Sequence, residues 1–388
     1  MKQYLELLTE LQVAAVKDNR TGISAASKFG HEMVFDLSKS IPLLSTKQVF
    51  MKPLIGELLC FIKGSTNAQD FRELGCNFWN ANANSHGTDL EGNTIENKWL
   101  SNAFRKGTDD LGPIYGAQWR NWDHTIYFSS PELIELASNN GFESSKLEGV
   151  MLEYEAVVFA NNLVIKAGYE YLGLLSDKDL HVFRKKVDQL AEAVKQLRTN
   201  PLNRRILVSG WNPGDMDKVA LPPCHVLQHW QCEPLTLTER IDWAQNYSNT
   251  EGNGLIYVPN PCTHEDMDAY YVPRYKLNLF LYQRSADTVL GIPYNIASYA
   301  IMNHIMCRMT NHVPGVFKYY TGDTHIYGNH GAAVEEQLCR VPINNSVTLK
   351  ISDHLRTLED FETAKVEDFV ISGYEHCGKL ESETPMAI

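Results

Sequence analysis

The sequence predicts a fold of the α/β (α+β) class, because stretches with the apolar spacing of helices and stretches with strand character both occur along it. Apolar residues recur at helical spacing over residues 2–17, and residues 51–63 form a strongly apolar helix. Residues 25–37 and 276–282 have strand character, and residues 319–327 alternate polar with apolar side chains. The chain has 388 residues, of which 44% are hydrophobic and 21% charged, as in a soluble globular protein with an ample core.

The overall composition excludes several classes of function. A net charge of −12 argues against non-specific nucleic-acid binding, so an anionic substrate must meet a local cluster of basic residues. No apolar run is long enough to cross a bilayer, and the charged, amphipathic N-terminal segment is not a secretory signal. Eight cysteines without regular spacing predict a reducing, cytoplasmic setting. Cys262 and His264 form a single C-x-H, which is a weak metal signal, so no metal is expected.

Three residues are candidates for function, and each has a structural alternative. Arg20 lies in a loop with glycine and hydroxyl groups that can hold a phosphate, although a solvated turn is the simpler interpretation. Glu57 lies within the apolar helix 51–63, where a buried carboxylate needs partners, or it faces water at the helix edge. Asn295 precedes the apolar helix 296–309 and can simply cap it.

Cys224 lies in a stretch that combines basic, apolar and proline residues. Arg204 and Arg205 form a fork-shaped anion clamp, and residues 206–208 read as a buried strand. The two prolines at 222–223 stiffen the approach to the thiol, and nearby guanidinium groups bias a thiol toward the nucleophilic thiolate. From this stretch alone, an activated nucleophile and a buried structural cysteine are equally good interpretations.

Three excursions interrupt the ordered chain, at approximately residues 84–111, 124–186 and 233–274. The second has its own apolar content over residues 150–165 and 169–175, which predicts a folded segment rather than a linker.

Several motifs follow one another in a distinctive order. They are Arg20-Thr21-Gly22, a helix with Glu57, Trp79-Asn80, Gly112–Arg120, Arg204-Arg205-Ile206, Leu221–His225, Tyr282–Asp287, Gly291–Tyr299 and Gly322–Tyr327. Together they resemble the thymidylate synthase family. The resemblance covers residues 1 to about 80, 112–122, 187–232 and 275–388, and the three excursions lie outside it.

The resemblance implies a homodimer of single-domain subunits, residues 1–388, in which the excursions are insertions. Each subunit is expected to have a curved mixed β-sheet flanked by helices, and the sheets are expected to pack across the dimer. The resemblance also implies one-carbon transfer from 5,10-methylenetetrahydrofolate, the co-substrate, to C5 of a pyrimidine deoxynucleotide. Addition of a thiolate to C6 would turn the ring into an enolate that attacks the folate methylene.

The resemblance assigns roles in catalysis and base reading. Cys224 is the expected nucleophile, and Glu57, with Tyr115 and His225, would serve proton transfer near O4 of the base. Asn295 matches the base-reading position, where an amide suits the O4 and N3–H edge of uracil, whereas an aspartate would suit cytosine. The expected substrate is therefore dUMP rather than dCMP.

Further residues are expected to hold the rest of the two substrates. The 5′-phosphate would be bound by Arg20, Arg284 and Ser285, and by Arg204 and Arg205 of the neighbouring subunit. The deoxyribose would be bound by His325 and Tyr327. The folate would face Trp79 and the adjacent Asn80, then Asp287 (which also belongs to the substrate site), Leu290 and Gly291, with the apolar C-terminus, including Ala387 and Ile388, closing over it.

Departures from the family pattern bear on the product. Asn80 stands where an aspartate is usual, Cys60 where a tryptophan is usual, Ile-Ser-Ala follows Gly22 in place of Thr-Gly-Thr, and His229-Trp230 replaces Gln-Phe. We expect from these a dUMP hydroxymethylase, in which water attacks the methylene intermediate to give 5-hydroxymethyl-dUMP. Such an enzyme would serve a virus that modifies its DNA with hydroxymethyluracil, in a host cytoplasm.

Two alternatives remain. The synthase-like C-terminal residues 385–388 favour a thymidylate synthase, in which hydride reduction gives dTMP and dihydrofolate. A non-catalytic nucleotide-binding relative, acting as a sensor or scaffold, is the alternative from a different class.

Overall fold

The computed structural model describes residues 1–19, 21–84, 107, 109–142, 150–250, 256, 258–344 and 346–385. The chain divides into two compact units, one formed by residues 1–120 with 189–388 and the other by residues 121–188. Each unit has a hydrophobic core of its own.

The larger unit contains most of the secondary structure. Its helices are α1 (Lys2–Gln12), α2 (Met51–Lys63), α3 (Ala68–Glu73), α4 (Asn80–Asn84), α5 (Tyr115–Arg120), α8 (Gln189–Thr199), α9 (Leu237–Thr250), α10 (His264–Ala269), α11 (Gly291–Thr310), α12 (Gly331–Cys339) and α13 (Leu358–Glu362), with 3₁₀ turns η1 (Pro213–Asp215), η2 (Gly328–His330) and η3 (Val366–Asp368). Its strands are β1 (Val16–Lys17), β2 (Ala25–Asp36), β6 (Leu207–Ser209), β7 (His225–Pro234), β8 (Tyr275–Asp287), β9 (Val313–Tyr327), β10 (Thr348–Ile351) and β11 (Phe369–Ser372).

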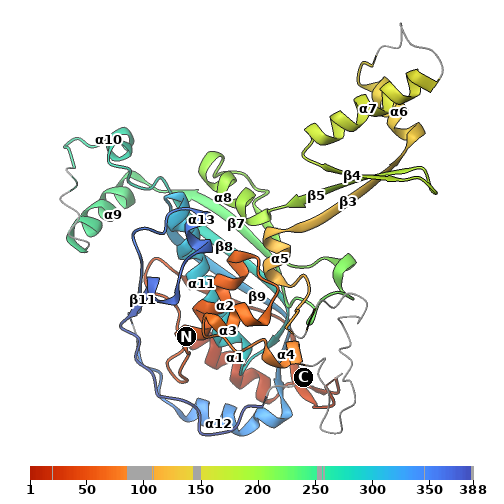
Figure 1. Ribbon diagram of the computed structural model, residues 1–388. Helices are drawn as coiled ribbons and strands as arrows, with labels where there is room; N and C mark the ends of the chain where they lie inside the picture. Colours follow the sequence, from red (N-terminus) through yellow and green to blue (C-terminus); the bar gives the residue numbers. More distant parts are fainter. Residues whose placement is uncertain are drawn as a thin grey trace. The chain divides into compact units, whose positions relative to one another are not determined.

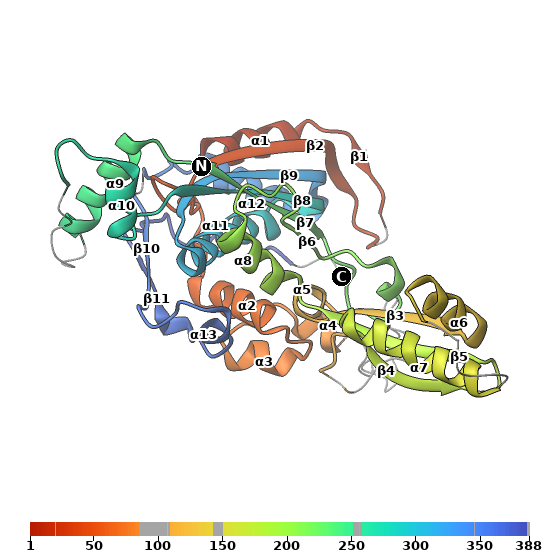
Figure 2. The same ribbon diagram turned by 90° about the horizontal axis from the view of Figure 1, so that it is seen from above.

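A six-stranded mixed sheet organises this unit, and Figure 1 labels its strands β7, β8 and β9. The full order is β1-β2-β9-β8-β7-β6, and Figure 2 labels all six strands. Strands β8 and β9 run parallel and are joined through α11, whereas the other neighbours in the sheet are antiparallel. Figure 2 shows α11 between the sheet and α2, and α11 contacts both. The predicted α/β class with a mixed sheet flanked by helices is therefore confirmed.

The alternation of side chains along β8 explains how the sheet is layered. Leu277, Leu279 and Leu281 are buried, and they belong to the same hydrophobic core as the apolar residues of α11. Phe280 and Tyr282 point to the opposite face and are only partly buried. The face of the sheet that carries Phe280 and Tyr282 is therefore apolar but stays partly exposed to solvent in a single chain.

Several predicted boundaries differ from the structure. The first helix ends at Gln12 rather than at residue 17, because the chain turns there and residues 16–17 pair with β2. The long apolar helix begins at Gly291, so Asn295 lies inside it and the capping interpretation is wrong.

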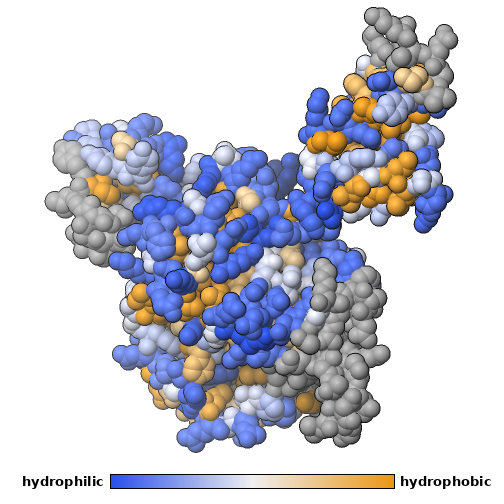
Figure 3. Space-filling view, viewed as in Figure 1, coloured by the Kyte–Doolittle hydropathy of each residue, from blue (hydrophilic) through white to orange (hydrophobic). Residues whose placement is uncertain are grey.

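The smaller unit is a three-stranded antiparallel sheet with two helices. Its elements are β3 (Trp122–Ser129), α6 (Ser130–Asn139), α7 (Val150–Lys166), β4 (Glu170–Leu175) and β5 (Leu180–Val187), in the sheet order β3-β5-β4. Phe183 and Leu133 lie in its core, whereas Leu172, Leu174 and Leu175 of the edge strand β4 are exposed. Figure 3 shows apolar residues on the surface of this unit. The excursion at 124–186 is thus folded; that it is an insertion stays a prediction.

The other two excursions are described to different extents. Most of residues 84–111 lie outside the described residues. Residues 233–274 contain α9 and α10, which are joined by the fully buried Arg240. Arg240 pairs with Asp268 and donates to the carbonyl oxygen of His264, and it also contacts the Nδ1 atom of that ring. His264 is thus part of a structural contact.

Two absences can be stated for the described ranges. No cluster of His, Cys, Asp and Glu side chains in them could hold a metal ion. Within the same ranges, no helix combines the length and apolar character that crossing a membrane needs.

Candidate active site

Cys224 immediately precedes β7 and is held by its backbone. The Cys224 N–H donates to the hydroxyl of Tyr115 on α5 at 2.7 Å, and the His225 N–H points to the same oxygen at 3.4 Å. The close approach of Gly210 supports this turn, because a Cβ atom there would lie 2.6 Å from the carbonyl oxygen of His225. The thiol residue is partly exposed, unlike the buried Cys60, whose pKa is raised to about 12 by burial.

Arg284 fixes the two prolines that lead to the cysteine. Its Nε atom donates to the carbonyl oxygen of Pro223 at 2.8 Å, and its Nη2 atom donates to that of Pro222 at 3.0 Å. Its own backbone N–H donates to the carbonyl oxygen of Cys224 at 2.8 Å, and its guanidinium lies 5.3 Å from the ring centroid of Trp211. The Arg284 guanidinium is thereby held against the two prolines that precede the cysteine.

Glu57 of α2 points toward Trp79 rather than out into solvent. The indole N–H of Trp79 donates to Glu57 Oε1 at 2.9 Å, and the carboxyl is only partly exposed. Burial raises the pKa of Glu57 to about 7, although the Trp79 hydrogen bond acts in the opposite direction. A carboxyl with that pKa can both give and take a proton near neutral pH.

His225 is held as a neutral ring. Burial lowers its pKa to about 4, and a hydrogen bond with the Asn295 side chain offsets part of that shift. The ring packs against Tyr115 and Tyr299, with centroids 5.0 and 5.2 Å away.

Asn295 is held by two residues that the sequence analysis did not single out. Its Nδ2 atom donates to Gln283 Oε1 at 2.9 Å, and the hydroxyl of Tyr319 donates to the same oxygen at 2.5 Å. Gln283 lies within the Tyr282–Asp287 motif. A polar side chain in a strand of apolar residues was the feature of the sequence that could have identified it as functional.

Four predicted residues meet where the parallel strands β8 and β9 end. Asp287 is in register with His325, and Ser285 with Asp323 two positions earlier. The rings of His325 and Tyr327 lie 4.9 Å apart, and His325 Nδ1 is 3.0 Å from Asp323 Oδ1. Because parallel strands present their carboxyl ends at one edge, Ser285, Asp287, His325 and Tyr327 lie at one end of the sheet.

Asp287 shapes the turn into α11. Its Oδ1 atom accepts from the backbone N–H groups of Val289 and Leu290, both at 2.9 Å. The buried Lys47 donates to the Val289 carbonyl oxygen at 2.6 Å, and burial lowers the pKa of Lys47 to about 8. The sequence analysis did not identify Lys47. The only feature that could have indicated its role was a charged side chain in an apolar, proline-containing connector.

Some predicted residues are not brought to this cluster. Arg204 and Arg205 are exposed, and neither guanidinium has a hydrogen-bond or ion-pair partner within the part of the chain that the structure describes. Asn80 Oδ1 accepts from Arg72 at 3.2 Å. The predictions for Arg20, Ala387 and Ile388 fall outside the described residues.

Together these groups define an enzyme whose site joins a cysteine to a cation, a near-neutral carboxyl and a side-chain amide. Comparison with known proteins then identifies the group of enzymes. The chain belongs to the thymidylate synthase family, whose family model, described as thymidylate synthase, matches residues 2–387. Enzymes of this family use methylenetetrahydrofolate as co-substrate and are generally dimeric.

Individual relatives agree over nearly the whole length. The chain is 33% identical to the thymidylate synthase of Pseudomonas putida over 401 aligned residues, covering 100% of both chains. It is 32% identical to that of Mycoplasma mobile, covering 97% of this chain and 96% of the relative. It is 31% identical to the bifunctional dihydrofolate reductase-thymidylate synthase of Zea mays, covering 98% of this chain and 53% of the relative.

Proposed function

We propose that this protein is a thymidylate synthase, which converts dUMP to dTMP and methylenetetrahydrofolate to dihydrofolate. The observation that carries the proposal is the full-length similarity to proteins named thymidylate synthase, at 33% and 32% identity. The relatives reported above are named synthases and not hydroxymethylases, so they favour the alternative in the sequence analysis over its first expectation.

The departures that favoured a hydroxymethylase have structural explanations. Cys60 and Trp230 are fully buried and belong to the hydrophobic core. The Asn80 side chain is engaged by Arg72 and Asn77 beside α3. These residues therefore need no special role in admitting water to the reaction.

In the proposed reaction, the Cys224 thiolate forms a bond to C6 of dUMP, and the electron pair moves to give an enolate. C5 then bonds to the methylene carbon and loses its proton, and the bond between that carbon and the folate nitrogen breaks. The tetrahydrofolate released would transfer a hydride to the exocyclic methylene and become dihydrofolate, and the bond between sulfur and C6 breaks as dTMP leaves. Arg284 supports the first step because it fixes the Pro222-Pro223 segment and places positive charge beside the thiol.

Glu57 and His225 are the proposed groups for proton movement around the base. Glu57, with a pKa near 7, is suited to exchange protons near O4. His225 remains neutral because it is buried, so it can donate or accept a hydrogen bond without adding charge. Tyr115 supports Cys224 and His225, since its hydroxyl accepts from the backbone N–H groups of both.

The proposed folate site fits the chemistry of a pterin. Asp287 offers carboxylate oxygen to the N–H groups of such a ring, and Leu290 and Gly291 follow at the start of α11. Trp79 is 5% exposed and packs edge-on to Phe61, so it offers only a small part of its surface. Its contact with Glu57 would couple the folate site to the proton-transfer group.

The proposed dimer gives a role to the exposed arginines and to the uncovered face of the sheet. Phe280, Tyr282 and Tyr320 lie partly exposed on that face. A second subunit packed there would bury them, and Arg204 and Arg205 are proposed to bind the phosphate in the partner's site.

The test is to incubate the protein with dUMP and methylenetetrahydrofolate, follow dihydrofolate by absorbance, and determine the nucleotide product by mass. We expect dTMP and dihydrofolate in equal amounts, and neither with the Cys224→Ser variant. Formation of 5-hydroxymethyl-dUMP without dihydrofolate would refute the proposal and establish the hydroxymethylase.

A further inference from the structure

The turn between β8 and α11 fixes one carboxylate oxygen of Asp287 and leaves the other available. Asp287 Oδ1 accepts from the backbone N–H groups of Val289 and Leu290, both at 2.9 Å. Its Oδ2 atom has no hydrogen-bond or ion-pair partner in the described ranges. Because the first oxygen is bound within the turn, the backbone of residues 287–290 sets the direction of the second.

Three groups from other parts of the chain hold this backbone. The hydroxyl of Tyr4 donates to the carbonyl oxygen of Thr288 at 2.9 Å, and the Lys47 ammonium donates to that of Val289 at 2.6 Å. The backbone N–H of Thr288 donates to the carbonyl oxygen of His325 at 2.9 Å. The turn is thus bound from α1, from the connector before α2 and from β9.

The hydroxyl of Tyr4 is not needed to fill space. Tyr4 is fully buried in the same core as Leu7 and Leu8 of its own helix, and a phenylalanine ring would occupy nearly the same volume. Burying a hydroxyl costs free energy unless it is hydrogen-bonded. Burial raises the pKa of Tyr4, and the charge of Asp287 acts in the same direction, so the hydroxyl keeps its proton and can donate.

The contact between Tyr4 and Thr288 is difficult to replace. Both residues are fully buried, so water cannot easily take the place of the tyrosine hydroxyl. Helix α1 packs beside β2 and β9 (Figure 2), and β9 pairs with β8, the strand that leads into the turn. The hydrogen bond therefore joins the first helix of the chain to the edge of the sheet at which the candidate site lies.

We propose that Tyr4 is a positioning residue for the folate, which acts by holding the turn that directs the free oxygen of Asp287 toward the pterin. The inference rests on the proposed function in one respect, because it takes Asp287 to bind the folate. It adds that a buried residue of the first helix, which contacts neither substrate, contributes to the affinity for the folate.

The test measures the dissociation constant of dihydrofolate by calorimetry, with the full chain saturated with dUMP. Dihydrofolate carries the pterin, and its binding requires no turnover. We expect Tyr4→Phe to weaken dihydrofolate binding by about fivefold and to leave the dissociation constant of dUMP unchanged. We expect Asp287→Asn to weaken it by about thirtyfold, because the amide keeps one oxygen for the turn and replaces the free oxygen with an NH₂ group.

The double variant decides whether Tyr4 acts through Asp287. In the Asp287→Asn background, Tyr4→Phe should change the affinity for dihydrofolate by no more than about twofold, because the oxygen that Tyr4 positions is already absent. The matched control is Leu8→Val, which shortens a fully buried side chain of the same helix without removing a hydrogen bond to the turn. It should keep the wild-type constant.

The outcomes separate this inference from the proposed function. Tyr4→Phe would overturn the inference if its effect were no larger than that of Leu8→Val, or equal in both backgrounds. Unchanged affinity in Asp287→Asn would also overturn it, even if Tyr4→Phe failed to fold. Formation of 5-hydroxymethyl-dUMP would instead refute the proposed function and leave the inference standing, since both reactions use the same folate.

Discussion

Arg284 is held by its own chain, whereas Arg204 and Arg205 are not. Arg284 donates to the carbonyl oxygens of Pro222 and Pro223 and lies against Trp211. Arg204 and Arg205 are exposed on the connection before β6, without a hydrogen-bond or ion-pair partner in the described ranges.

The difference separates two ways of placing a charge. Arg284 is pre-organised, so little conformational freedom remains to be lost when an anion binds. A freely rotating arginine must lose that freedom on binding unless another molecule orders it. In the proposed dimer, the partner subunit would order Arg204 and Arg205. Part of each phosphate site would then form only when two subunits associate.

The largest expected effect is that of Arg284→Ala. It removes a cation beside Cys224 and also frees the Pro222-Pro223 segment, so we expect kcat/KM to fall by about 10³-fold. Steady-state kinetics with dUMP measure it. Arg284 acts on the Cys224 site of its own chain, so a partner subunit with an intact Arg284 should not restore the activity of that site. Restored activity at that site in mixed dimers would contradict the comparison.

Arg205→Ala should have a smaller effect that can be repaired. Loss of one charged hydrogen-bonding group should lower kcat/KM by about tenfold to a hundredfold, mainly through a higher KM for dUMP. Mixing this variant with an inactive Cys224→Ala variant should restore about a quarter of wild-type activity, since half of the dimers are mixed and each has one complete site.

The control for this experiment is a mixture of Arg284→Ala with Cys224→Ala, measured after the same unfolding and refolding. Arg284 and Cys224 belong to the site of the same chain, so no mixed dimer contains a complete site and no recovery is expected. No recovery in the mixture of Arg205→Ala with Cys224→Ala would show that Arg205 serves its own subunit.

The sequence predicts those parts of the site whose residues are neighbours along the chain. Cys224 next to two prolines, and Ser285 and Asp287 at the end of a strand, can be recognised along the chain because each motif is continuous. The fold class follows in the same way from apolar spacing in 51–63 and alternation in 276–282.

Contacts between distant segments could not be predicted. Tyr319 meets Gln283 across 36 positions only because β8 and β9 pair in a particular register. Lys47 meets Val289 across 242 positions. A shift of one residue in β8 or β9 would turn Gln283 or Tyr319 to the other face of the sheet, and no local pattern records the register.

The burial of Glu57, in the part of the site that one chain forms by itself, should make the free energy of unfolding depend on pH. The pKa of Glu57 is raised to about 7 in the folded chain, so between pH 4.5 and 7 the folded state binds more protons than the unfolded state. The free energy of unfolding should therefore decrease as the pH rises through this range, by about 1–3 kcal/mol from this group.

Glu57→Gln should remove that contribution, because an amide does not titrate. Denaturant unfolding of both proteins at pH 5 and pH 8 gives the difference, in which the other titrating groups cancel. An identical pH dependence in the two proteins would mean that Glu57 is not placed in a buried environment.

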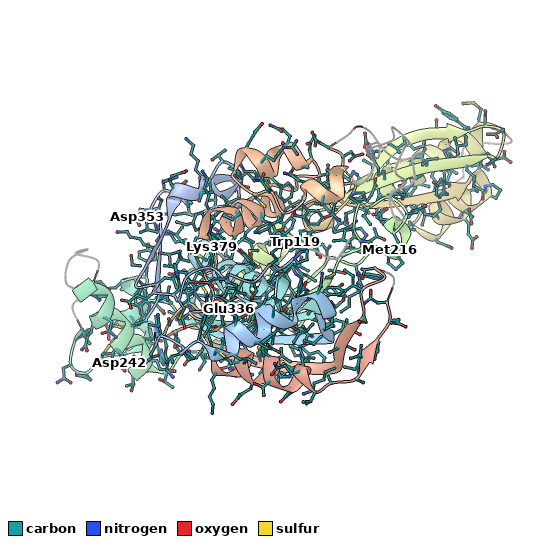
Figure 4. The ribbon with its side chains drawn as sticks, turned by 90° about the horizontal axis from the view of Figure 1, so that it is seen from below. Trp119, Met216, Asp242, Glu336, Asp353 and Lys379 are labelled. Atoms are coloured by element: carbon teal, nitrogen blue, oxygen red, sulfur yellow. The ribbon has the colours of Figure 1, made fainter. Side chains whose placement is uncertain are left out.

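The smallest expected effect concerns residues 379–382 near the C-terminus, whose backbone is bound by the charged side chains of Glu336 and Arg340. Glu336 lies on α12 (Figure 4). It accepts from the backbone N–H groups of Glu381 and Ser382, both at 2.9 Å. Arg340 donates to Glu336 at 2.6 Å and to the carbonyl oxygen of Lys379, also at 2.6 Å. These backbone contacts lower the pKa of Glu336 to about 2, so the clamp stays charged at neutral pH.

Glu336→Gln should loosen this clamp, since an amide has one oxygen to accept and its nitrogen faces a backbone donor. We expect trypsin to cleave after Lys379 about fivefold faster, measured by mass spectrometry, together with a rise of similar size in the KM for methylenetetrahydrofolate. Glu335→Gln, an equal change of charge on the exposed neighbour, is the matched control. If both variants are cleaved at the same rate, the segment is not held by Glu336. If cleavage alone increases, the clamp serves stability, and the folate site is organised by Arg284 and its neighbours without it.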